Sequence, residues 1–186
     1  MDILPPNKPH ITREDALKKL FPYTDKVNTY KVILLGIRGY FKDTMGKPGV
    51  NDRGIYDDAL CMITPDNFYT FNFNTDPSRA IPGVATLVPG LYFYKIGMHG
   101  VSGDHPYEAL RQWSRVTVTR DGQDGEFTDT SGAPFYTDIH RGGFGTTSSL
   151  GCQTVPPAQW EEFHPLVKEL LAKYGQEVVP YVLSVA

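Results

Sequence analysis

The sequence predicts a mainly β protein with short flanking helices, and three observations support this. Glycine and proline are both frequent, at 18 and 15 residues, which favours short strands and turns over long helices. The apolar runs are short and rich in β-branched and aromatic residues. The length of 186 residues suits one core, and no repeat or linker divides it. We therefore expect residues 1–186 to form a single domain with a β-sandwich or barrel-like sheet.

Helices are expected near both ends of the chain. Thr12 is a typical N-cap for a short helix, and it follows a flexible arm over residues 1–11 that contains three prolines. Pro157 begins a second helix with an apolar stripe on one face. We expect Pro165 to kink or split this helix and Gly175 to end it.

Strands are expected between these two helices. The segments with strand-like composition are 31–38, 56–64, 68–73, 85–94, 115–120 and 135–140. Cys61 lies in the second of them and is expected to be a buried, unreactive thiol. The pair Asp57-Asp58 is expected to be a solvated turn or strand start.

Composition narrows the possible partners. The net charge is −3 and lysine and arginine do not cluster, which argues against nucleic acid. No apolar run is long enough for a membrane-spanning helix. The first residues lack a basic-then-apolar leader, so we expect cytoplasmic synthesis and a separate route to any site of action outside. Two cysteines are too few for a disulfide scaffold. No cofactor is expected, and we expect a monomer.

A candidate site lies between Ile139 and Gln153. Cys152 follows Gly151 in a loop rich in serine, threonine and glycine, and His140 precedes it by twelve residues at the end of an expected strand. A thiolate is the reactive form of cysteine, and a nearby imidazole is the usual means of generating it. On this pattern alone, a buried structural cysteine and a structural histidine remain an equal alternative.

The residues of this site resemble a known active-site motif. Ile139-His140-Arg141-Gly142 followed by Ser148-Ser149-Leu150-Gly151-Cys152-Gln153 resembles the motif of the L,D-transpeptidase family of peptidoglycan enzymes. Val88-Pro89-Gly90-Leu91-Tyr92 is a second, weaker match, so that residues 85–155 carry the resemblance. It implies a β-sandwich or barrel-like catalytic domain in which Cys152 is the nucleophile and His140 the base. It also implies that Ser149 shapes the motif and that the Gly151 and Cys152 amides stabilise the oxyanion.

The chain departs from that family at three points. Leu150 stands where the family has a histidine, Thr154 stands where an arginine is frequent, and the gap from His140 to Cys152 is short. The runs Ile37-Arg38-Gly39-Tyr40 and Asn51-Asp52-Arg53-Gly54 resemble those of small phage and prophage proteins with the same cysteine motif. The resemblance is therefore to a compact, phage-like variant.

Several residues are candidates for substrate binding around the cysteine. They are Arg141, Ser149, Gly143, His99 and His105. Arg141 is the best placed of three arginines that could bind a peptide carboxylate, the others being Arg38 and Arg53, which are more often structural. His99 or His105 could replace the imidazole missing at Leu150, or both could be solvated loop histidines.

Two further hypotheses concern the histidines. Asp138 could orient His140, because residues two apart point to the same side of a strand. His99, His140 and either Asp104 or His105 could ligate zinc, but no compact zinc motif supports this, and no metal is expected.

We expect a cysteine peptidase that cleaves peptidoglycan stem peptides through a thioester at Cys152, in the manner of a phage endolysin. It would act in the periplasm or cell wall after lysis-type release or export. An L,D-transpeptidase or exported toxin with an amine acceptor is one alternative. An inactive cell-wall-binding or virion module is another, and Leu150 is the feature that favours it.

Overall fold

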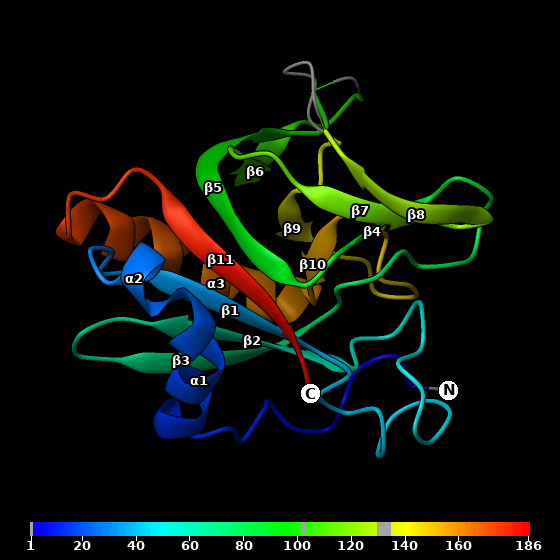
Figure 1. Ribbon diagram of the computed structural model, residues 1–186, viewed down its shortest axis with the longest axis horizontal. Helices are drawn as coiled ribbons and strands as arrows, with labels where there is room; N and C mark the ends of the chain where they lie inside the picture. The colour runs from blue at the N-terminus through cyan, green and yellow to red at the C-terminus, as the bar shows by residue number, and fades with distance from the viewer. Residues whose placement is uncertain (1, 102, 130–134) are drawn as a thin grey trace.

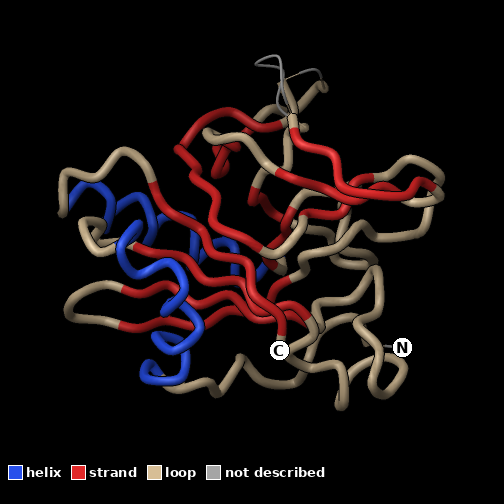
Figure 2. The backbone as a smooth tube through the Cα atoms, viewed as in Figure 1, coloured by secondary structure: helices blue, strands red, loops and turns tan. Residues whose placement is uncertain are grey.

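Eight strands form one mixed sheet that curls into a nearly closed barrel, with a small three-stranded sheet beside it (Figures 1 and 2). This computed structural model describes residues 2–101, 103–129 and 135–186. The large sheet has the strand order β10-β9-β6-β5-β11-β1-β2-β3, and the small sheet has the order β4-β7-β8. The expected mainly β architecture is confirmed, in its barrel-like form.

The strands of the large sheet are β1 (Ile33–Arg38), β2 (Asp58–Ile63), β3 (Phe68–Phe73), β5 (Gly90–His99), β6 (Tyr107–Gln112), β9 (Ile139–Arg141), β10 (Gln153–Val155) and β11 (Val179–Val185). Those of the small sheet are β4 (Ala85–Leu87), β7 (Thr117–Arg120) and β8 (Gln123–Thr128). The helices are α1 (Arg13–Leu20), the short 3-10 helix η1 (Phe21–Tyr23), α2 (Thr24–Val27) and α3 (Pro157–Lys173).

The barrel is closed by a short bridge between its first and last strands. Asn74, just after β3, and Thr154 in β10 exchange two backbone hydrogen bonds of 2.9 Å each. The buried side chain of Asn74 also donates from Nδ2 to Thr154 Oγ1 at 3.2 Å. Strand β10, which leads out of the candidate cysteine loop, is thus held on both edges.

The strands at the centre of the sheet are buried on both faces. Alternation along β1 sends Leu34 into one apolar cluster and Leu35 into the other. The first cluster is completed by α3 and the second by α1, so a helix covers each face. Cys61 lies fully buried in the second cluster, where burial raises the pKa of its thiol to about 12. It is the inert core cysteine that the sequence predicts.

The two expected helices form where their end signals lie. Thr12 caps α1 by accepting a hydrogen bond from the Asp15 amide at 3.1 Å. Gly175 adopts φ +61° directly after α3, as expected of a helix-ending glycine. The expected split at Pro165 is wrong, because α3 continues through it. Pro165 lies on the exposed side, where water can bind the carbonyl that loses its amide partner.

The strand predictions are correct in place but incomplete. Segments 31–38, 56–64, 68–73, 85–94 and 115–120 all contain strands, and 135–140 contains only the beginning of β9. β6, β8, β10 and β11 were not expected. The β6 segment contains Glu108, Ala109, Leu110 and Gln112, which favour a helix in isolation, so tertiary pairing overrides local propensity there.

The N-terminal segment does not extend away from the body. The Tyr56 amide donates to the Ile3 carbonyl at 2.7 Å, and Thr70 Oγ1 donates to the Pro9 carbonyl at 2.9 Å. Residues 2–11 therefore lie along β3 and the start of β2. The prediction of a flexible arm over residues 1–11 is wrong for the described residues 2–11. Backbone groups of neighbouring elements hold this segment in place, a contact that composition does not reveal.

The Asp57-Asp58 pair is buried, and its expected exposure is wrong. The Asp58 carboxylate accepts hydrogen bonds of 2.6 Å from the amides of Gly39 and Thr75. One of these amides directly follows β1, the other lies near the end of β3, and neither has a strand partner. Asp58 therefore joins the ends of the two strands. Within the described ranges, no helix is long and apolar enough to cross a membrane.

Candidate active site

The candidate cysteine and histidine lie on two neighbouring parallel strands. β9 and β10 pair with Ile139 opposite Gln153 and His140 opposite Thr154. The Gln153 amide donates to the Asp138 carbonyl at 2.8 Å, which continues the register backward and places Cys152 beside Asp138. The structure therefore places the two predicted residues on adjacent strands, where Thr154 stands opposite His140 and Cys152 Sγ is hydrogen-bonded to Tyr136 and not to the imidazole.

The loop before Cys152 is shaped by Ser149. Its hydroxyl accepts a hydrogen bond from the Gly151 amide at 3.0 Å and donates to the Cys152 carbonyl at 2.7 Å. The Ser149 amide in turn donates to Ser78 Oγ at 2.7 Å. Ser149 is buried, so it acts on the loop rather than on a substrate. The Gly151 amide is already bound, which leaves the Cys152 amide as the better oxyanion donor.

Glycines in this segment allow close packing. Gly151 adopts φ +125°, and a Cβ there would lie 2.8 Å from the Ala85 carbonyl oxygen. A Cβ on Gly143 would lie 2.4 Å from Ser148 Oγ, and the Gly143 carbonyl accepts a 2.8 Å hydrogen bond from Tyr56. Gly143, expected to bind substrate, therefore has a packing role in this structure.

Cys152 is a neutral thiol here. The residue is partly exposed, and its packed surroundings raise the pKa of the thiol to about 12 through desolvation. Sγ donates a hydrogen bond of 3.1 Å to the carbonyl of Tyr136. Tyr136 itself has φ +57°, a conformation that costs a non-glycine residue energy and that often occurs at functional sites.

His140 is a buried, neutral imidazole. Burial first, and then the neighbouring His99 ring, lower its pKa to about 4. Nδ1 lies 2.8 Å from the Arg141 carbonyl oxygen and 3.1 Å from the Tyr107 hydroxyl. Because a carbonyl only accepts hydrogen bonds, Nδ1 carries the ring proton and Nε2 carries the free electron pair. Nε2 is therefore the ring atom that could accept a proton.

His99 and His105 differ completely in their surroundings. His99, at the end of β5, stacks on His140 with ring centroids 4.1 Å apart and planes inclined by 16°. Its Nδ1 contacts Asp138 Oδ2 at 2.8 Å. His105 is exposed. Of the two histidines, only His99 touches the candidate base. The expected contact between Asp138 and His140 is replaced by this contact with His99.

The three candidate arginines also differ in their surroundings. Arg38 donates to the Thr75 and Leu87 carbonyls at 3.0 and 2.9 Å, and Arg53 pairs with Asp121 at 2.7 Å, so both are structural. Arg141 is exposed, with its guanidinium 5.5 Å from the Tyr107 ring centroid. Arg141 remains available to a ligand.

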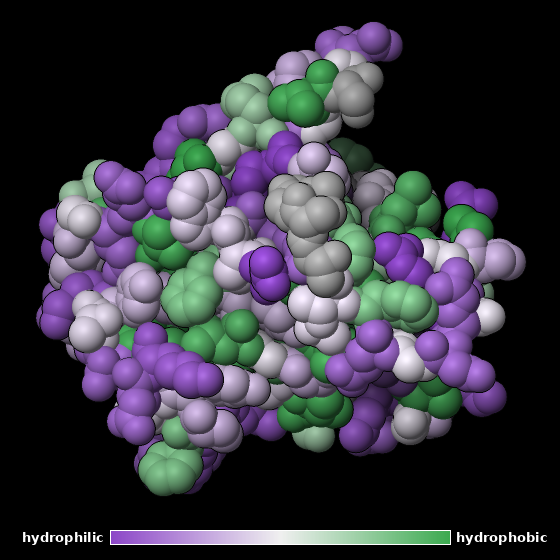
Figure 3. All heavy atoms as spheres, turned by 45° about the horizontal axis from the view of Figure 1, so that its top comes forward, coloured by the Kyte–Doolittle hydropathy of each residue, from purple (hydrophilic) through white to green (hydrophobic). Residues whose placement is uncertain are grey.

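Two hollows lie next to these residues. A pocket of about 580 Å³ is lined by His99, Arg111, Tyr136 and Asp138, among others. A second pocket of about 390 Å³ is lined by Tyr107, Arg141, His105 and His164 with their neighbours. The face that Figure 3 turns forward carries hydrophobic side chains scattered among hydrophilic ones. Leu150, 72% exposed, contributes an apolar surface to the cysteine loop.

Sequence reasoning missed Tyr107, Arg111 and Tyr136. Tyr107 and Arg111 are four residues apart in β6 and share a face of that strand, but the segment did not read as a strand. Tyr136 contributes its backbone carbonyl, which no side-chain pattern can reveal. The zinc hypothesis finds no support, since no group of three histidine, cysteine or acidic residues suited to a metal occurs in the part of the chain that the structure describes.

Comparison with known proteins does not assign the chain to a family. The chain matches no protein-family model, no curated protein and no solved structure at a significant level. The class of this site therefore rests on its residues and their geometry.

Proposed function

We propose that this protein is a cysteine enzyme of the L,D-transpeptidase type that acts on the stem peptides of peptidoglycan, with cleavage as its reaction. The observation that carries the proposal is the neutral imidazole of His140, fixed through Nδ1 to the Arg141 carbonyl, on the strand that pairs with the cysteine-bearing segment. The motif Ser149-Leu150-Gly151-Cys152 and its resemblance to that family support the same class.

The charge state of the pair dictates how the reaction begins. With a thiol pKa near 12 and an imidazole pKa near 4, the proton stays on sulfur in the resting protein. Attack therefore requires His140 Nε2 to accept the thiol proton as Sγ bonds to the peptide carbonyl carbon. The Sγ hydrogen bond to the Tyr136 carbonyl breaks in this step.

The rest of the reaction follows from the same groups. The oxyanion of the tetrahedral intermediate receives a hydrogen bond from the Cys152 amide. Collapse of the intermediate breaks the peptide C–N bond, and the His140 imidazolium returns its proton to the leaving amine. The product is a thioester on Cys152. Water, deprotonated by His140, then attacks the thioester, releasing a carboxylic acid and the thiol.

A stem peptide suits the surroundings of the site. It carries several carboxylates, and Arg141 presents an exposed guanidinium next to the base. The two hollows lined by His99 and by Tyr107 with Arg141 give room for peptide near the reacting atoms. An amine that reaches the thioester in place of water would make the protein a transpeptidase, which is the second candidate reaction of the same site.

Purified sacculi provide the test. The wild type is expected to release new muropeptides, detected by mass, and Cys152→Ala and His140→Ala to release none. Cys61→Ala serves as the matched control, because Cys61 is the other thiol and lies in the core. No product from the wild type contradicts the proposal and favours an inactive wall-binding module. Product that persists with Cys152→Ala contradicts the thiol mechanism. Cross-linked dimers in place of cleaved peptides identify the transpeptidase.

A further inference from the structure

A buried carboxylate joins three strands beside the candidate base. Asp138, directly before β9, accepts a hydrogen bond from the Gln112 amide at 3.0 Å through Oδ1. Its Oδ2 lies 2.8 Å from His99 Nδ1 and 2.9 Å from Arg111 Nε. Asp138 is 1% exposed. A carboxylate in such a place needs several partners, and the partners here come from β5 and β6.

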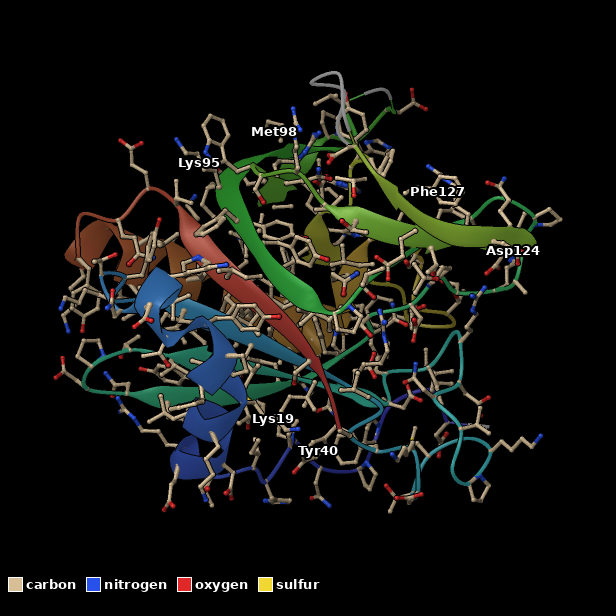
Figure 4. The ribbon with its side chains drawn as sticks, in the orientation of Figure 1. Lys19, Tyr40, Lys95, Met98, Asp124 and Phe127 are labelled. Carbon is tan, nitrogen blue, oxygen red and sulfur yellow. The ribbon has the colours of Figure 1, made fainter. Side chains whose placement is uncertain are left out.

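Arg111 ties the same region together from the other side. Its Nη1 donates to the carbonyl of Met98, the residue before His99, which Figure 4 labels in the upper part of β5. His99 is therefore held at its side chain by Asp138 and through the preceding carbonyl by Arg111. An imidazole held in this way has little freedom to rotate.

The ring held by these contacts lies flat on His140. The two planes differ by 16° at a centroid distance of 4.1 Å. Tyr107 meets both rings with its edge, at 5.5 Å from His99 and 6.5 Å from His140. His140 is thus enclosed by His99 on its face and by the Tyr107 hydroxyl and the Arg141 carbonyl at Nδ1.

We propose that His99, held by Asp138, is the positioning residue for His140 and fixes the plane of the base. This inference rests on the proposed role of His140 as the base. His99 lowers the tendency of His140 to become charged, as its effect on the His140 pKa indicates. The other charged or titratable groups around the base are Asp138, Arg141, Tyr107, Arg111 and Cys152.

Four variants test the proposal. His99→Gln removes the stacked ring, His99→Phe keeps a stacked ring without the imidazole nitrogens, and Asp138→Asn weakens the hold on His99. His10→Gln is the matched control, because His10 is an exposed histidine in the N-terminal segment and lines neither hollow. The readouts are the NMR titration of the His140 ring, assigned with His140→Gln, and the pH profile of muropeptide release from sacculi.

With His99→Gln, the His140 titration moves to higher pH and release at pH 7 falls about tenfold, since small misplacements of a reacting group are costly. His99→Phe moves the titration in the same direction but retains more of the release. If His99→Gln does not fold, Asp138→Asn carries the test through release alone, because Asp138 itself acts on the His140 pKa. Slower release than with His10→Gln then supports the proposal.

The proposal is overturned if His99→Gln leaves both readouts, or Asp138→Asn in its place leaves release, as His10→Gln does. Failure of the proposed function looks different. In that case wild-type protein releases nothing from sacculi, while the His140 titration still reports whether His99 controls the ring.

Discussion

Gly151 determines the course of the backbone directly before Cys152. Its φ of +125° is open to glycine and strained for any other residue, and the space for a Cβ is taken by the Ala85 carbonyl. The same conformation lets Ser149 Oγ reach both the Gly151 amide and the Cys152 carbonyl. One small residue thus aligns the thiol, the amide beside it and strand β4.

Gly151→Ala is expected to lower the free energy of unfolding by about 2 kcal/mol, because both backbone strain and a backbone clash oppose the new methyl group. Muropeptide release should fall further than stability alone explains, since the Cys152 amide moves. Urea unfolding and the sacculus assay measure the two effects. Gly145→Ala is the matched control, since no atom lies within 4 Å of its Cβ position and its φ is not positive. Equal behaviour of the two variants would contradict this account.

The charge states of Cys152 and His140 are also set residue by residue. Desolvation favours the neutral form of each, and the two effects together keep the proton on sulfur. A preformed thiolate–imidazolium pair would need the opposite arrangement. Both side chains are therefore uncharged at neutral pH.

At the scale of elements, the start of β2 holds two buried acidic side chains with raised pKa values. Asp57 and Asp58 are both buried, and Asp76 lies close enough to raise their pKa values further. Desolvation, the largest cause, raises the pKa of Asp57 to about 7. Asp57 Oδ2 accepts a hydrogen bond of 2.8 Å from the Asp52 amide, and Oδ1 has no partner among the described residues.

This pKa makes a prediction about stability and pH. Between the ordinary pKa of 3.8 and about 7, the unfolded chain loses the Asp57 proton while the folded protein keeps it, so stability falls as pH rises. Asp57→Asn removes this loss and is expected to raise the free energy of unfolding at pH 8 by on the order of 1 kcal/mol.

Urea unfolding of Asp57→Asn at pH 4 and pH 8 checks the prediction, and the gain should be small at pH 4, which lies close to the unfolded pKa of 3.8, so that little of the loss has yet accumulated. Asp124→Asn is the control, because Asp124 is exposed on β8, where Figure 4 labels it. A gain of the same size at both pH values, or a loss at pH 8, would show that Asp57 is ionised in the folded protein.

At the scale of the whole molecule, the closure of the barrel positions the site. The bridge between Asn74 and Thr154 joins the end of β3 to β10, which are separated by 80 residues in sequence. β10 would otherwise be an edge strand held only by β9. Since Cys152 is the residue directly before β10, the position of the thiol depends on this bridge.

Asn74→Ala is expected to lower the free energy of unfolding by about 1–3 kcal/mol, because it leaves buried partners of Nδ2 without a hydrogen bond. Those partners are the Asp76 carbonyl at 2.7 Å and Thr154 Oγ1 at 3.2 Å. Amide hydrogen exchange at Thr154 should also become faster than in the wild type. Asn28→Ala, at an exposed asparagine after α2, is the control. Unchanged exchange at Thr154 would mean that β9 alone holds β10.

Much of the fold could be predicted from the sequence, and the parts that could not depend on contacts between distant segments. α1 begins after the capping Thr12, and α3 begins at Pro157 and is followed by Gly175, so local signals predict these helices well. β6 was missed because its residues favour a helix alone, and it becomes a strand only through β5. The burial of Asp57 and Asp58 likewise depends on segments distant in sequence.

The sequence by itself pointed to the pair Cys152 and His140 and to the glycine beside the thiol, because a loop of only eleven residues, 142–152, joins two short strands and the needed conformations are local. The tertiary structure alone decided which groups surround the base. His99, Tyr107 and Arg111 come from β5 and β6, and Asp138 turns toward them instead of toward His140. These contacts cross strands, and since pairing between distant segments sets which side chains meet, no local pattern in the chain encodes them.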